Sequence, residues 1–106
     1  MGLNSTIYDR PLGSILQERA HASNIHKAEV WFSSKQESIV RELEQAADKG
    51  QFEFVLEEAV FPTVYESGDF GIAIIEVLEN FLKKEGIQLI FDEDLDKYVI
   101  YWRNLG

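Results

Sequence analysis

Two residues in the first third of the chain have the types and the spacing of metal ligands. Glu18 and His21 show the Glu-x-x-His spacing with which carboxylate-bridged sites in helical bundles bind their metals. Such a site needs two of these patterns and two further glutamates, whereas His26 and Glu29 follow in the reverse order. We therefore interpret these four residues as ordinary helix positions and expect no metal at them.

The acidic run Asp92-Glu93-Asp94-Leu95-Asp96 has carboxylates at its first, third and fifth positions, as a calcium-binding loop does. That loop also needs glycine at its sixth position and a bidentate acid at its twelfth. This chain has Lys97 and Arg103 at those places. The run therefore predicts an acidic hairpin turn.

The rest of the sequence contains no recognisable catalytic or cofactor motif. No serine has a nucleophile-elbow context, no glycine-rich phosphate loop is present, and neither histidine belongs to a known motif. The chain also has no cysteine, which excludes disulfides, thiol catalysis and thiolate zinc sites. We expect a protein that is not an enzyme and that binds no cofactor.

Length and hydropathy indicate one small domain. A chain of 106 residues normally has a single core. No apolar run is long enough for a membrane span, and the first twenty residues carry charges where a secretion signal would be apolar. We expect a soluble cytoplasmic protein with a flexible arm over residues 1–10 and a single α+β domain over residues 11–106.

Apolar residues recur every three or four positions from Leu12 to Phe32, which predicts an N-terminal helix over residues 11–33. The segment Ser34-Lys35-Gln36-Glu37 has the form of a capping box. A helix is therefore expected to begin or resume at Ser34, and glycine at position 50 is expected to end it.

A second helix is predicted by the wide apolar face that runs from Phe70 to Leu82. We expect Ser67 or Asp69 to cap its beginning and Gly86 to end it. The stretch before it, residues 60–68, is expected to be a loop that contains a short extra strand or a packed flap.

Alternating apolar residues predict a strand after each helix and a third strand at the end. The alternation covers residues 52–56, residues 87–91 and residues 98–102. Together these elements predict an α+β fold, in which two helices cover one face of a small antiparallel sheet of about three strands. Trp102 is expected to pack beneath Phe81 or its neighbours.

The order of a helix ending in Ala-Ala-x-x-Gly, a strand, a helix of Leu-x-x-x-Gly type and a terminal strand ending in Trp resembles a loose group of small proteins from tailed bacteriophages. The residues that carry the resemblance are Ala46-Ala47-Asp48-Lys49-Gly50, Leu82-Lys83-Lys84-Glu85-Gly86 and Tyr98-Val99-Ile100-Tyr101-Trp102. They cover about the last two thirds of the chain. The resemblance implies a phage accessory protein that acts in the host cytoplasm. Because these motifs are structural, it implies no functional residue.

Negative charge is concentrated in the second half of the chain. From Gly50 onward twelve acidic residues accompany four basic ones, whereas the two kinds nearly balance before that point. Contacts to phosphate depend on clustered Lys and Arg, so we expect neither direct nucleic-acid binding nor membrane binding. An acidic surface instead favours a protein with a basic surface.

We therefore expect a non-catalytic phage accessory protein that binds and modulates a host or defence protein, with mimicry of nucleic acid as one route. The residues expected to contact that partner are Asp92, Glu93, Asp94, Asp96, Glu57, Glu58 and Glu66. The alternative is a self-assembling structural or scaffolding component of a phage particle. In either case the stripe Leu12, Leu16, Ala20 and Ile25 predicts a homodimer built on the first helix.

Overall fold

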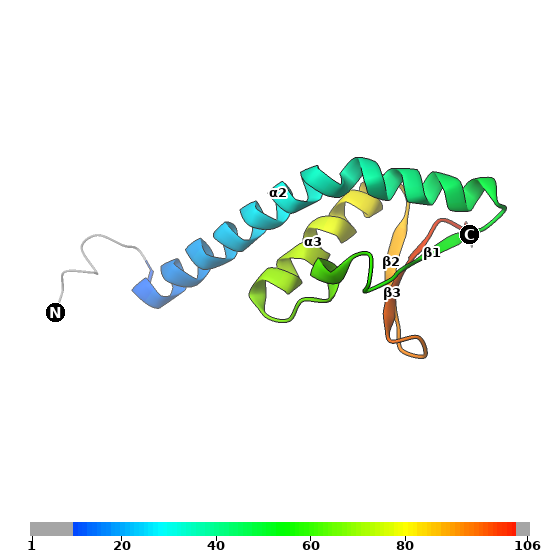
Figure 1. The fold of residues 1–106 in the computed structure, drawn as a ribbon. Coiled ribbons are helices and arrows are strands. Elements are labelled where there is room, and N and C mark those ends of the chain that lie inside the picture. The colour runs from blue at the N-terminus through cyan, green and yellow to red at the C-terminus, as the bar shows by residue number, and fades with distance from the viewer. Residues whose placement is uncertain (1–9, 104–106) are drawn as a thin grey trace.

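The computed structural model describes residues 10–103. Over this range the chain forms two α-helices, a short 3₁₀ helix and a three-stranded sheet (Figure 1). The elements are α2 (Leu12–Asp48), β1 (Glu53–Leu56), η1 (Pro62–Tyr65), α3 (Asp69–Lys84), β2 (Gln88–Asp92) and β3 (Lys97–Tyr101). The predicted α+β fold is confirmed, and the expected arm at residues 1–10 lies outside the described residues except for Arg10.

Helix α2 is continuous over 37 residues, so the expected boundary near Ser34 is not observed. The Ser34 hydroxyl donates a hydrogen bond to the carbonyl of Trp31 at 2.6 Å, three residues earlier, and does not cap a new helix. This local bond is compatible with an uninterrupted helix. At 1.5 Å per residue α2 is about 55 Å long, and its first turns extend beyond the start of α3 (Figure 1).

Both helices end as predicted, at Gly50 and Gly86. These glycines have φ of 83° and 76°, a region that side chains with a Cβ rarely adopt. After α3 the amide of Ile87 donates to the carbonyl of Leu82 at 2.8 Å, and Gln51 donates to Ala46 in the same way after α2. This 6→1 hydrogen bond characterises the Schellman motif, which turns the chain directly into the next strand.

The three strands form one antiparallel sheet in the order β1-β3-β2, so the last strand of the chain is the central one. The register places Ile100 between Phe54 of β1 and Leu89 of β2. Successive side chains point to opposite faces of a sheet, so these three residues share the face that meets the helices.

The core lies between that face and the two helices. Helix α2 contacts β1, and α3 contacts β2. Phe32 of α2 and Phe81 of α3 touch with ring centroids 4.8 Å apart. Trp102 is half-buried and packs against the same core. The fully buried residues of largest volume are Ile39, Leu56, Ile74, Leu78, Leu82, Val99 and Ile100.

The connection between β1 and α3 contains the 3₁₀ helix Pro62–Tyr65 in place of the extra strand that was one expected alternative. Phe61 and Val64 are buried in the core, so this segment is packed, as the other alternative stated. The capping of α3 differs from the prediction. Gly68 occupies the N-cap position of α3 with no side-chain cap, so neither Ser67 nor Asp69 performs that role. The backbone of Gly71 packs against the carbonyl oxygen of Glu66 at a spacing that leaves no room for a Cβ.

Candidate functional site

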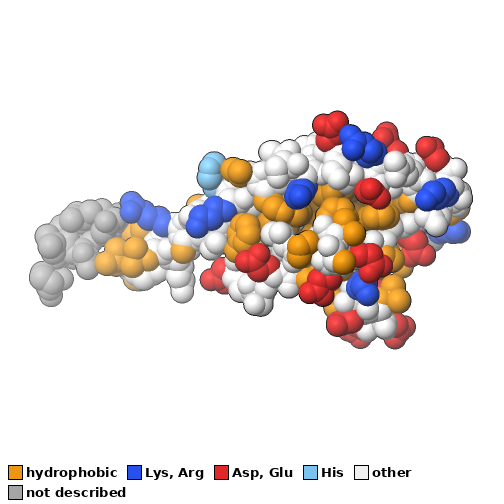
Figure 2. All heavy atoms as spheres, viewed as in Figure 1, with side chains coloured by type: hydrophobic (Ala, Val, Ile, Leu, Met, Phe, Trp, Pro, Cys, Tyr) orange, Lys and Arg blue, Asp and Glu red, His pale blue; other side chains and the backbone are white. Residues whose placement is uncertain are grey.

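The acidic residues expected to bind a partner gather at one end of the sheet. The β2–β3 turn supplies four of them, the end of β1 supplies Glu57 and Glu58, and the end of η1 supplies Glu66. Figure 2 shows acidic side chains around the tip of this hairpin, at the bottom of the view. Lys97 is the only basic residue within these three segments.

The four hairpin acids differ in their roles. Asp92 accepts hydrogen bonds at Oδ1 from the amides of Asp94 and Leu95, at 2.9 and 3.2 Å, and so shapes the turn. Asp96 adopts a φ of 57°, a conformation that Asp tolerates better than most residues. Glu93 and Asp94 are exposed at the tip. The predicted acidic hairpin turn is therefore confirmed, and its free carboxylates project into solvent.

Glu57 connects the β1 end of this surface to the hairpin. Its Oε1 lies 3.6 Å from Lys97 Nζ, and Lys97 pairs with Asp92 in the β2–β3 register. Both Glu57 and Lys97 are partly exposed, so the pair contributes little to stability. One lysine therefore lies between two of the predicted site residues and offsets a small part of their charge.

The Tyr65 hydroxyl fixes η1 to the sheet at this end. It donates a hydrogen bond to the carbonyl of Leu56 and accepts one from the amide of Tyr98 at 2.8 Å, and these two residues pair between β1 and β3. Burial raises the pKa of Tyr65 above its ordinary value of 10.0, and the carboxylates of Glu57 and Glu58 add to the rise. The hydroxyl therefore keeps its proton and remains a donor.

Exposed apolar side chains accompany the acids. Phe91 is 41% exposed and Leu95 is 49% exposed, although both belong to the hairpin. Phe91 also contacts Tyr98 edge to face and, with Ile72 and Glu66, lines a hollow of about 440 Å³ beside the start of α3. The acidic end of the sheet thus offers apolar contact surface with a charged border.

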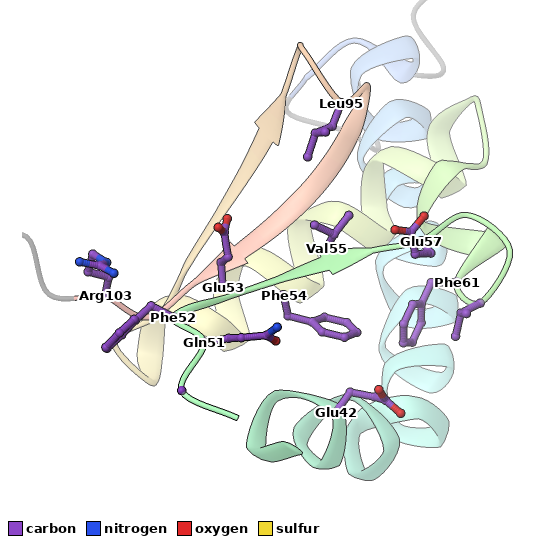
Figure 3. A pocket seen from close by; sticks show the side chains of 12 residues that line it. Glu42, Gln51, Phe52, Glu53, Phe54, Val55, Glu57, Phe61, Leu95 and Arg103 are labelled. Atoms are coloured by element: carbon purple, nitrogen blue, oxygen red, sulfur yellow. The ribbon is translucent and has the colours of Figure 1, made fainter. Parts of the chain in front are cut away.

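A larger groove of about 750 Å³ follows the outer edge of β1 (Figure 3). Phe54 and Phe61 line its helix side and meet edge to face, with ring centroids 6.4 Å apart. Val55 and Leu95 line the side that faces away from the helices. Glu42 of α2 also borders the groove.

The sheet face opposite the helices carries an apolar row that the sequence analysis did not identify. Val55, Val99 and Ile90 are neighbours across the three strands. On this face Val99 is 0% exposed, whereas Ile90 remains 44% exposed. The strand order brings the three residues into one row.

Other predicted features are placed apart from this end. His21 Nε2 lies 3.4 Å from Glu76 Oε2 of α3, and Glu18 pairs with Arg10. Between residues 10 and 103, no three His, Asp or Glu side chains gather as ligands for a metal ion. In the same range no helix has the length and apolar character needed to cross a membrane.

Comparison of this chain with protein-family models, with curated proteins and with solved structures finds no match.

Proposed function

We propose that this chain is a non-catalytic accessory protein of a bacteriophage that acts in the host cytoplasm by binding a host or defence protein. The phage setting rests on the resemblance of the helix stops and the last strand. One observation carries the binding role: acids from three separate segments meet at one end of the sheet beside the exposed Phe91 and Leu95.

The physical basis is the pairing of apolar contact area with a charged border. Protein interfaces commonly have an apolar, aromatic-rich centre and a polar rim. At this end Phe91 beside α3 and Leu95 on the opposite face supply apolar contact area, while Glu93 and Asp94 at the tip supply the charged border. An acidic rim accelerates encounter with a basic surface, including one that otherwise binds nucleic acid, and the acceleration decreases with salt.

The test uses the double variant Glu93→Lys with Asp94→Lys. Proteins are captured from bacterial lysate treated with nuclease, and the association rate of the captured partner is measured at low and high salt. We expect the variant to bind more slowly, with its folding unchanged, because rim charges act mainly on association. The matched control is Glu44→Lys, a charge reversal at an exposed position of α2 outside the hairpin.

A rate that changes neither with salt nor with the hairpin variant would contradict a role for these acids. A rate reduced equally by the Glu44→Lys control would assign the effect to overall charge instead of this surface.

Self-assembly is the second candidate, and the projecting half of α2 favours it. Leu12 is 36% exposed and Leu16 is 53% exposed, and no residue of α2 before Ala28 is buried. A second copy that packs on this face would form the proposed homodimer. A sedimentation mass that rises with protein concentration would support this candidate.

A further inference from the structure

Among the described residues, the outer edge of β1 pairs with no other strand. The Trp102 amide donates to the Phe52 carbonyl at 3.1 Å, in the register that places Phe54 opposite Ile100. In an antiparallel pair, alternate residues direct both backbone groups to the partner strand and the others direct them outward. Glu53 and Val55 therefore direct N–H and C=O away from β3, and within residues 10–103 no further strand pairs with this edge.

The groove described above leaves space at this edge for another strand. Side chains of an added strand would point alternately to its two faces, so they would contact the two sides of the groove in turn. On the helix side an incoming residue would meet Phe54 and Phe61. On the other side it would lie next to Val55 and extend the apolar row of Val55, Val99 and Ile90 by one position.

The charges that border the groove indicate which kind of added strand would bind there. Glu53 and Glu57 flank Val55 on the open face of the sheet, and Glu42 borders the helix side. Glu57 has Lys97 as a neighbour, while Arg103 stacks on Phe52 4.3 Å from the ring centroid, at the far end of the groove. On this face the side chains of Glu53, Val55 and Glu57 are therefore acidic, apolar and acidic in turn. It complements a segment with the order basic, apolar, basic at alternate positions.

The same pattern argues against a second copy of this chain. If two β1 strands paired antiparallel with Val55 opposite Val55, Glu53 of each copy would face Glu57 of the other. Like charges directly opposite each other destabilise a strand pair.

The free edge of β2 offers a weaker match. There the hollow beside the strand is bordered by Glu79 and Lys83, whose opposite charges offset each other. A basic strand gains less at that edge than at β1.

We propose that the partner contributes an extended segment that adds as a fourth strand to the edge of β1. The segment carries an apolar residue opposite Val55 and Lys or Arg two positions to either side, facing Glu53 and Glu57. Strand addition of this kind obtains affinity from main-chain hydrogen bonds and specificity from alternate side chains. This inference rests on the proposed function, because it states how the partner is held.

The probe is a capped synthetic peptide that contains Lys-Leu-Val-Leu-Lys, titrated into the ¹⁵N-labelled protein. We expect the largest amide shifts, and slower hydrogen exchange, at Glu53 and Val55. Two further peptides carry a single N-methyl group, one on the central valine and one on the following leucine. Because alternate amides face β1, one of the two should lose binding and the other should retain it. The protein itself is unchanged in this comparison.

The charge requirement is tested with Glu53→Lys combined with Glu57→Lys, which we expect to weaken the peptide about tenfold, since two exposed ion pairs are reversed. The matched control Glu79→Lys at the β2 edge should change the dissociation constant by less than about twofold. Equal binding of both methylated peptides, failure of both, or amide shifts centred on β2 would overturn strand addition. Those results would leave the proposed function standing, because it is tested at the hairpin tip with the whole partner.

Discussion

At the scale of single residues, Tyr65 is the side chain whose hydrogen bonds most directly hold the candidate site together. Its hydroxyl connects the carbonyl of Leu56 with the amide of Tyr98. Tyr65→Phe would leave both backbone groups without this partner, and we expect a loss of about 1 to 3 kcal/mol in the free energy of unfolding. Urea denaturation of the wild-type and variant proteins measures this difference in the free energy of unfolding. Tyr101→Phe, which removes a hydroxyl at the surface near Glu53, is the control and should have a smaller effect on the free energy of unfolding.

The same hydroxyl predicts a pH dependence. The pKa of Tyr65 is raised in the native state, chiefly by burial, so the protonated form is favoured there. Well below pH 10 the tyrosine is protonated in both the native and the unfolded state, so it does not change the free energy of unfolding as pH varies. Above pH 10 the unfolded chain ionises first, and stability decreases as pH rises towards the native pKa. Thermal unfolding between pH 8 and about 11 should show a smaller decrease in Tyr65→Phe, and an identical decrease would contradict this role.

At the scale of elements, the beginning of α3 depends on Gly71. A Cβ built there would lie 1.7 Å from the carbonyl oxygen of Glu66, and a backbone atom cannot move aside as a flexible side chain does. Gly71→Ala should therefore cost about 3 kcal/mol, the upper part of the range for overpacking. Gly13→Ala is the matched control. No atom lies within 4 Å of its Cβ position, and alanine should stabilise α2 by about 0.5 to 1 kcal/mol. Equal effects of the two changes in chemical denaturation would contradict the close approach.

Local signals in the sequence predicted most elements and the antiparallel α+β fold, but not the order of the strands. The glycines at positions 50 and 86 predicted the ends of the helices, and the alternation of apolar residues predicted β2. Each of these signals depends on only a few adjacent residues. The capping box at Ser34 misled because serine can also bond to a carbonyl of its own helix. The position of β3 between β1 and β2 depends on pairing between distant segments. The free edge of β1 and the row through Val99 therefore had no local signature.

At the scale of the whole molecule, one long helix gives the protein an elongated form, with extents of 64 × 32 × 28 Å. Buried side chains in α2 begin only at Ala28. Of the stripe expected to form a dimer, Ile25 packs against the core, whereas Leu12, Leu16 and Ala20 remain exposed. A helical segment of this length without packing is only marginally stable in water, so the projecting turns either fray or are covered.

Covered and fraying turns at the start of α2 would differ in their response to protein concentration. If a second copy covers the projecting turns, amides of residues 14–24 should exchange more slowly as protein concentration rises, whereas those of residues 39–46 should not respond. Leu16→Lys should abolish both the concentration dependence and the dimer mass in sedimentation, because it places charge in the apolar contact. Val30→Lys is the matched control, since Val30 is 58% exposed on α2 but lies outside the stripe. A monomer at about 100 μM, with fast exchange at residues 14–24 at every concentration, would instead identify the first turns of α2 as a fraying end.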